Sequence, residues 1–259
     1  MSKHAPLGIT PTNRFSFYAA HAYWYIAAKS KQLQNKPLHV QIWDRPFVLF
    51  RNAQGEASAL LDRCAHRNSP LSGGICTEGR IQCPYHGWQF DSAGICRKVP
   101  SLCSEQQGKA RVIPAFPTRE LQGYVWVYTD LQTKPNHAPF EFPCMDDSRY
   151  TLIAYEADFE ATLHATAENI LDVPHTAFLH KGLFRGGEPS KIETIVRRYS
   201  DRVECQYVGE PRPSGIMAKL LAPGAGEVEH YDRFLLPGVA QVEYRLGEKA
   251  HLMATSCLT

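Results

Sequence analysis

The sequence lacks the features that mark membrane, secreted and nucleic-acid-binding proteins. Within its 259 residues, no stretch approaches the roughly 18 consecutive apolar residues that a membrane span needs. The first residues contain no apolar core of the kind found in secretory signals, and no internal repeat occurs. A net charge of +2, with 21% charged and 44% hydrophobic residues, gives no broad excess of charge toward nucleic acid or anionic lipid. We therefore expect a cytoplasmic globular protein with one large domain or two modest ones.

A dinucleotide-binding loop is also absent, because no Gly-x-Gly-x-x-Gly follows a predicted strand. The chain has eight cysteines instead. In a reducing cytosol, cysteines in a chain of this size indicate metal ligation or buried thiols before disulfides. Only Cys64 and Cys83 lie near a histidine at ligand spacing, so these two are the candidate ligands.

Strand-like runs and turn residues divide the chain. Residues 1–37 form an N-terminal segment, and residues 38–133 are predicted to be an all-β module rich in β-branched and aromatic runs. Its predicted strands cover 39–50, 59–61, 80–83, 88–90 and 123–129, with a hairpin turn at 52–56.

A linker is predicted over 134–149, where three prolines fall between positions 134 and 143. The remaining residues, 150–259, combine strands with one helix, which makes the whole chain α+β. Strands are expected at 150–159, 194–198, 203–208 and 239–246. The helix is expected over 161–172, and Pro174 interrupts it.

Two cysteine–histidine pairs carry the strongest chemical signal. The sequence reads Cys64-Ala65-His66-Arg67 and, after sixteen residues that follow His66, Cys83-Pro84-Tyr85-His86-Gly87-Trp88. Two thiolates and two imidazoles fit either a tetrahedral zinc ion or a [2Fe–2S] cluster with both cysteines on one iron and both histidines on the other. The pairs lie on two turns of a β module, and each turn supplies both ligand types, which favours the two-iron cluster.

These motifs, followed by Phe90-Asp91 and Gly94, closely resemble the Rieske domain of ring-hydroxylating and related oxygenases. The resemblance implies that Cys64, His66, Cys83 and His86 hold a Rieske [2Fe–2S] cluster. Respiratory Rieske proteins carry one further cysteine in each loop, near Ser69 and Tyr85 here. Neither position is cysteine, so the resemblance is to the oxygenase or soluble-ferredoxin kind.

A second motif follows the linker. Residues 168–180 read Glu-Asn-Ile-Leu-Asp-Val-Pro-His-Thr-Ala-Phe-Leu-His. Two histidines near carboxylates suggest a mononuclear iron site of the two-histidine, one-carboxylate type. Residues five apart face about 140° apart on a regular helix, so His175 and His180 can converge only if the helix is broken, for which Pro174 gives a reason.

This motif strongly resembles the catalytic iron site of Rieske non-haem iron oxygenases, in a helix-grip-like α+β domain with an antiparallel sheet. The resemblance implies that His175 and His180 bind iron. It further implies that Asp172 links a cluster histidine of one subunit to an iron-binding histidine of the next, and that Asn169 lies close to the iron. Such a relay between subunits implies a homotrimer.

By the same resemblance, the protein is the terminal component of an oxygenase. An NAD(P)H-dependent reductase or a ferredoxin would deliver electrons to the cluster. The cluster would pass them to a mononuclear Fe(II) that activates O₂ for hydroxylation or demethylation of a hydrophobic organic substrate, as a mono- or dioxygenase.

One iron ligand is missing from the expected pattern. The family takes its carboxylate from an aspartate well over a hundred residues beyond the second histidine, whereas only 79 residues follow His180. We therefore expect a chain truncated at its C-terminus. Among the carboxylates downstream of His180, the remaining candidates for the third ligand are Asp201, Glu227, Glu229, Asp232 and Glu243.

Two alternatives to the oxygenase stay open. A Rieske electron carrier would need the first motif and not the second, and a zinc-bound interaction module would need neither iron site. Iron content and colour of the purified protein separate the three.

Overall fold

The computed structural model describes residues 20, 22–100, 111–179, 192–210, 228–247 and 250–259. The chain divides into two compact units, Met1–Glu141 and Phe142–Thr259. The division falls inside the predicted linker at 134–149.

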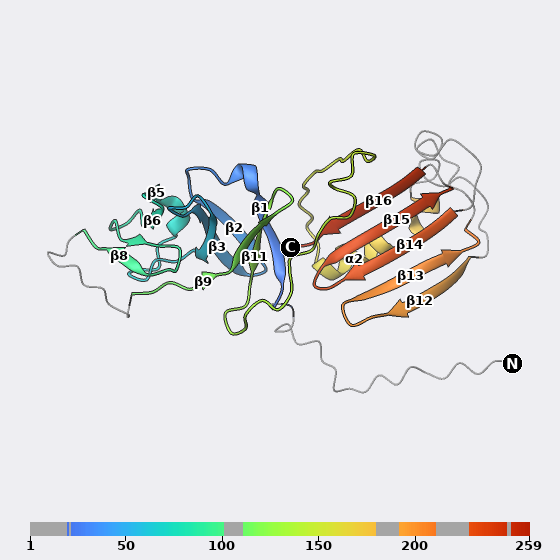
Figure 1. Ribbon diagram of the computed structural model, residues 1–259. Helices are drawn as coiled ribbons and strands as arrows, with labels where there is room; N and C mark the ends of the chain where they lie inside the picture. Colours follow the sequence, from blue (N-terminus) through green and yellow to red (C-terminus); the bar gives the residue numbers. More distant parts are fainter. Residues whose placement is uncertain (1–19, 21, 101–110, 180–191, 211–227, 248–249) are drawn as a thin grey trace, which may run out of the picture. The chain divides into compact units, whose positions relative to one another are not determined.

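The first unit consists of three small antiparallel sheets with short 3₁₀ turns (Figure 1). One sheet has the order β1-β11-β10, another β2-β3-β4-β9, and the third β5-β6-β7-β8. Their bounds are β1 Trp24–Lys29, η1 Ser30–Gln32, β2 Leu38–Ile42, β3 Arg45–Arg51, β4 Ala57–Leu61, η2 Leu71–Gly73, β5 Ile75–Thr77, β6 Arg80–Gln82, β7 Gln89–Phe90, β8 Cys96–Lys98, β9 Ala115–Phe116, β10 Thr118–Leu121 and β11 Tyr124–Tyr128.

Most predicted strands of this unit are present. The predicted strand 39–50 is two strands, β2 and β3, because a turn at Trp43 separates them. The hairpin between β3 and β4 is closed by Asn52, whose side chain accepts the backbone N–H groups of Gln54 and Glu56. Strand β1 pairs with β11, so pairing in this unit begins before residue 38.

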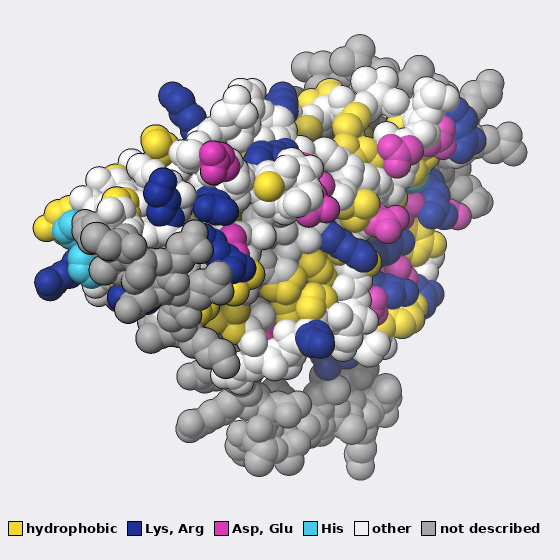
Figure 2. All heavy atoms as spheres, turned by 60° about the vertical axis from the view of Figure 1, so that its left-hand side comes forward, with side chains coloured by type: hydrophobic (Ala, Val, Ile, Leu, Met, Phe, Trp, Pro, Cys, Tyr) yellow, Lys and Arg dark blue, Asp and Glu magenta, His cyan; other side chains and the backbone are white. Residues whose placement is uncertain are grey.

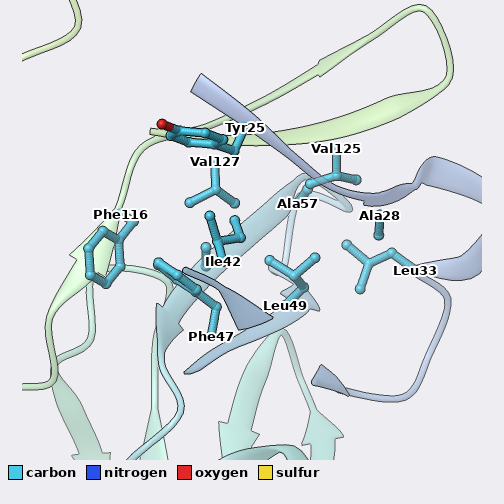
Figure 3. Packing of buried hydrophobic residues seen from close by; sticks show 11 residues of the cluster. Tyr25, Ala28, Leu33, Ile42, Phe47, Leu49, Ala57, Phe116, Val125 and Val127 are labelled. Carbon is cyan, nitrogen blue, oxygen red and sulfur yellow. The ribbon is translucent and has the colours of Figure 1, made fainter. Parts of the chain in front are cut away.

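Strand β3 separates two hydrophobic cores, which explains its unbroken apolar run. Phe47 and Leu49 face one core, and Val48 and Phe50 face the other. The first core, shown in Figure 3, brings residues of β1, β2, β3, β4, β9 and β11 together, with the rings of Phe47 and Phe116 edge to face at 4.8 Å. The second core includes the thiols of Cys64 and Cys83.

The second unit is a five-stranded antiparallel meander with the helix α2 on one face (Figure 1). The helix contacts β14 and β15. The elements are α2 Leu163–Leu171, α3 His175–Phe178, β12 Glu193–Arg198, β13 Arg202–Val208, β14 Val228–Leu235, β15 Val239–Leu246 and β16 Ala250–Cys257.

Local sequence explains where α2 starts and stops. The Thr162 hydroxyl accepts the N–H of Ala165 at 3.2 Å, which caps the N-terminus. Asp172 has an extended backbone and ends α2, and Pro174 is the N-cap of the next short helix. The predicted strand at 150–159 is wrong, because residues 151–159 form no strand and are exposed.

Candidate metal centres

The two cysteine–histidine loops share one backbone design. In each, the cysteine N–H donates to the carbonyl five residues on, and its carbonyl accepts the N–H four residues on. For Cys64 these bonds reach Ser69 at 2.9 Å and Asn68 at 3.0 Å; for Cys83 they reach Trp88 at 2.8 Å and Gly87 at 3.1 Å. The fourth residue after each cysteine is left-handed, with φ of 56° at Asn68 and 70° at Gly87. The two loops therefore have the same backbone conformation around their thiols, and we call each of them a cradle.

The two thiols lie together inside the second core. Cys64 and Cys83 are each 2% exposed, and neither forms a disulfide. Burial, together with the neighbouring Cys83 thiol, raises the pKa of the Cys64 thiol to about 11. A buried pair of thiols of this kind becomes a pair of thiolates only when a metal compensates the charge.

The two histidines lie together at the surface. Their Nδ1 atoms are 3.1 Å apart, and the ring of His66 stacks on Trp88 at 4.6 Å with the planes parallel within 1°. Slight desolvation and the nearby positive charges, His86 foremost, lower the pKa of His66. Figure 2 shows histidine side chains grouped at the surface. Two imidazoles whose Nδ1 atoms lie this close together suit a shared metal.

The donor set fits a cluster with two irons better than a single zinc ion. Among the described residues, no three His, Cys, Asp or Glu side chains converge as the ligands of one ion would. The donors form a buried thiol pair and an exposed imidazole pair. A Rieske cluster uses such pairs, since each of its irons takes two protein ligands and the bridging sulfides complete the coordination.

The second motif lies where α2 breaks. His175 is the first residue of α3, and its Nδ1 is hydrogen-bonded to the backbone carbonyl of Asp172. The Asp172 carboxylate lies 3.7 Å from the same nitrogen. A carbonyl or carboxylate on one ring nitrogen is how metal-binding histidines are usually oriented, with the other nitrogen toward the metal. Asn169 and Asp172 are exposed, and His180 lies outside the described residues.

The downstream carboxylates are held by cationic partners. Asp201 pairs with Arg202, and Glu229 pairs with Arg245. Glu243 is 2% exposed and pairs with Arg233 at 2.5 Å. Burial alone would raise the pKa of Glu243, but Arg233 and its other partners outweigh burial and hold it below its usual range. Glu227 lies outside the described residues.

The sequence did not indicate a buried cluster in the second unit. His230 lies between the carboxylates of Glu210 and Asp232, and all three residues are buried. The available signal was His230 and Asp232 two residues apart on one strand, which places both on one sheet face.

Comparison with known proteins assigns both units. Residues 23–117 match the family model for the Rieske [2Fe–2S] domain, and residues 159–258 match the vanillate O-demethylase oxygenase C-terminal domain.

Among curated relatives, the oxygenase component of dicamba O-demethylase from Stenotrophomonas maltophilia is 30% identical over 201 residues, covering 76% of this chain and 59% of the relative. Methylxanthine N1-demethylase NdmA from Pseudomonas putida is 33% identical over 147 residues, covering 56% of this chain and 41% of the relative. This chain thus spans less than two thirds of these relatives.

The crystal structure of dicamba monooxygenase bound to dicamba superposes with a TM-score of 0.77 at 26% identity, covering 93% of this chain and 73% of that one. The similarity runs through both units. The chain therefore belongs to the Rieske non-haem iron oxygenases.

Proposed function

We propose that this protein is the terminal component of an oxygenase that hydroxylates or demethylates a small hydrophobic organic compound. The observation that carries the proposal is the coexistence of two units in one chain. One holds a buried thiol pair and an exposed imidazole pair in twin cradles, and the other matches an oxygenase catalytic domain. A Rieske electron carrier has no use for the second unit, so that alternative is disfavoured.

When bound, the [2Fe–2S] cluster supplies one-electron transfer and a mononuclear Fe(II) supplies O₂ activation. In this proposal Cys64 and Cys83 hold the inner iron within the core. His66 and His86 hold the outer iron at the surface, where an electron donor or acceptor can approach. Trp88 keeps the His66 ring in place through the parallel stack.

The catalytic site is proposed at the break between α2 and α3. His175 and His180 are the proposed iron-binding histidines, with Asn169 close to the metal. The Asp172 carbonyl orients the His175 ring, and its exposed carboxylate is available to a cluster histidine of another subunit. This arrangement supports a homotrimer, in which each catalytic site receives electrons from a neighbour.

The partners follow from the same proposal. A separate NAD(P)H-dependent reductase or ferredoxin reduces the cluster, and O₂ and the organic substrate meet at the second site. The demethylase relatives favour a monooxygenase that demethylates over a dioxygenase. In the part of the chain that the structure describes, no helix is long and apolar enough to cross a membrane. We keep the cytoplasm as the proposed location.

Metal analysis of the full chain tests the proposal. Anaerobically purified protein loaded with iron and sulfide should be red-brown, with iron above two per chain. Cys83→Ser should abolish the Rieske electron paramagnetic resonance signal. His175→Ala should keep that signal and lose about one iron, because the two sites have separate ligands.

Cys76→Ser is the matched control, since Cys76 lies in the same module on β5 and is outside the ligand set. It should retain colour, signal and iron content. A colourless wild-type protein that holds zinc would overturn the proposal, and a His175→Ala protein with unchanged iron would overturn the second site.

A further inference from the structure

A single arginine of the first unit contacts the aromatic stack at the ligand loops. The guanidinium carbon of Arg111 lies over the Trp88 ring, 5.0 Å from its centre. The same indole carries the parallel ring of His66 at 4.6 Å. Trp88 therefore lies in contact with both a cation and an imidazole that is a proposed ligand of the outer iron.

The backbone of Arg111 is fixed relative to the ligand loops. Its carbonyl accepts the N–H of Cys96 at 3.1 Å, and two residues further on the N–H of Ile113 donates to the carbonyl of Gly94 at 2.9 Å. Cys96 and Ile113 belong to the second hydrophobic core, which also contains the two ligand thiols. The guanidinium thus extends from a well-anchored part of the chain.

The charge of this guanidinium is not neutralised by a neighbour. In the part of the chain that the structure describes, no carboxylate pairs with it, and its Nη1 is buried without a hydrogen-bond partner. The aspartates that flank the two ligand loops have other partners, since Asp91 pairs with Arg97 at 2.5 Å and Asp62 with His39 at 2.8 Å. A partly buried cation without a counter-ion costs stability, which indicates a role other than folding.

A fixed cation at this place favours the reduced form of a Rieske cluster. When oxidised, two ferric ions, two sulfides and two thiolates together carry no net charge. One electron from the proposed reductase or ferredoxin leaves the cluster with one negative charge. A cation that water screens poorly stabilises the negative state more than the neutral one. Local charge and exposure to solvent are among the factors that set the reduction potential of iron–sulfur clusters.

Resting on the proposed function and its ligand set, we propose that Arg111 raises the reduction potential of the cluster. Trp88 holds the guanidinium beside His66, because a cation is attracted to the face of an indole. Arg111 is therefore a positioning residue for electrons: it touches neither substrate nor metal and acts through its charge. It makes the cluster a better acceptor for its electron donor and a weaker donor to the catalytic iron.

A redox titration of the full, cluster-loaded chain, followed by electron paramagnetic resonance and visible absorption, tests this inference. Arg111→Gln removes the charge and should lower the equilibrium constant for one-electron reduction about tenfold, which corresponds to about 59 mV. Arg111→Lys keeps the charge and should stay within about threefold of wild type. The g values should not change in either variant, because the ligands are the same.

Arg119→Gln is the matched control, because it removes the same charge from the same unit. Arg119 is exposed on β10, in a sheet whose strands do not flank the ligand loops. Its substitution should change the equilibrium constant less than about twofold, since water screens an exposed charge. Arg111→Met keeps an aliphatic stem over the indole and is the second neutral variant, in case Arg111→Gln does not load its cluster.

Three results would overturn the inference. One is a change below threefold in the neutral Arg111 variants. Another is an equal loss in Arg111→Lys, which would show that the shape of the guanidinium matters and its charge does not. The third is failure of both neutral variants to hold a cluster, which would make Arg111 a structural residue. A wild type without a Rieske signal would refute the proposed ligand set and this inference with it, whereas the three results refute the inference alone.

Discussion

The two units hold their functional groups in different ways. In the first unit, each ligand loop closes on itself through backbone bonds spanning four and five residues, and its cysteine belongs to the second hydrophobic core. In the second, the buried cluster joins His230 and Asp232 of β14 to Glu210, which follows β13, and the ion pairs of Arg233 join β14 to β13 and β15. A site built from local loops depends on apolar packing around it, whereas one built across a sheet depends on charge balance and strand register.

Phe47→Ala gives the largest expected effect on stability. Phe47 is fully buried and packs against Phe116, so its loss should lower the free energy of unfolding of the first unit by about 3–5 kcal/mol. All four tryptophans lie in the first unit, so tryptophan fluorescence during urea unfolding reports on that unit alone. Val112→Ala, at a half-exposed valine, should shift the transition little. An equally small shift for Phe47→Ala would contradict the claim that the first unit depends on apolar packing.

Glu243→Gln tests the claim that the second unit depends on charge balance. The substitution keeps the shape but removes the negative charge facing Arg233 and Arg245, and Arg233 retains Glu204. We expect a loss of about 1–3 kcal/mol in the second unit. Far-ultraviolet circular dichroism should show an earlier transition while tryptophan fluorescence stays unchanged. A shift of the fluorescence transition instead would show that the units do not unfold separately.

The smallest expected effect is a pH dependence from His230. Glu210 and Asp232 face its nitrogens and Tyr207 and Tyr244 its ring, and the carboxylates raise its pKa in the folded state. Its stabilising contribution is therefore complete below the unfolded pKa, about 6.5. It is lost as pH rises through the higher folded pKa.

Urea unfolding followed by circular dichroism from pH 6 to pH 9 should therefore show the second unit losing stability with rising pH. His230→Gln should flatten this slope, because glutamine does not titrate. A wild-type slope of the opposite sign would contradict the cationic state of His230.

Local sequence was enough to predict most strands of the first unit and to single out its proposed ligands. Cys64, His66, Cys83 and His86 are recognisable because each loop carries its ligands within a few residues, and the strand runs around them are short and apolar. The exception was the boundary at residue 38, since β1 joins the sheet through β11, about a hundred residues further along the chain.

The second unit was predicted less completely, because its interactions are distant in sequence. The break at Pro174 could be predicted from the proline, and β12, β13 and β15 from strand propensity, whereas β14 and β16 were not predicted. The stretch 150–159 has strand-like residues but no partner strand, so propensity alone gave the wrong answer there. The pairing of Glu210 with His230 depends on the register of β13 against β14, which no local pattern reveals.

The twin cradles also bear on how the protein acquires its cluster. Each loop is closed by its own backbone bonds, and the thiols lie in a core that apolar side chains complete. We therefore expect cluster insertion to be a late loading step onto a finished scaffold, unlike small zinc modules, which fold only around their ion. The two cradles should also differ in which substitutions they tolerate at their left-handed residue. Asn68 can be exchanged for glycine, whereas a side chain at Gly87 would meet the Pro100 ring at 3.0 Å in a left-handed backbone.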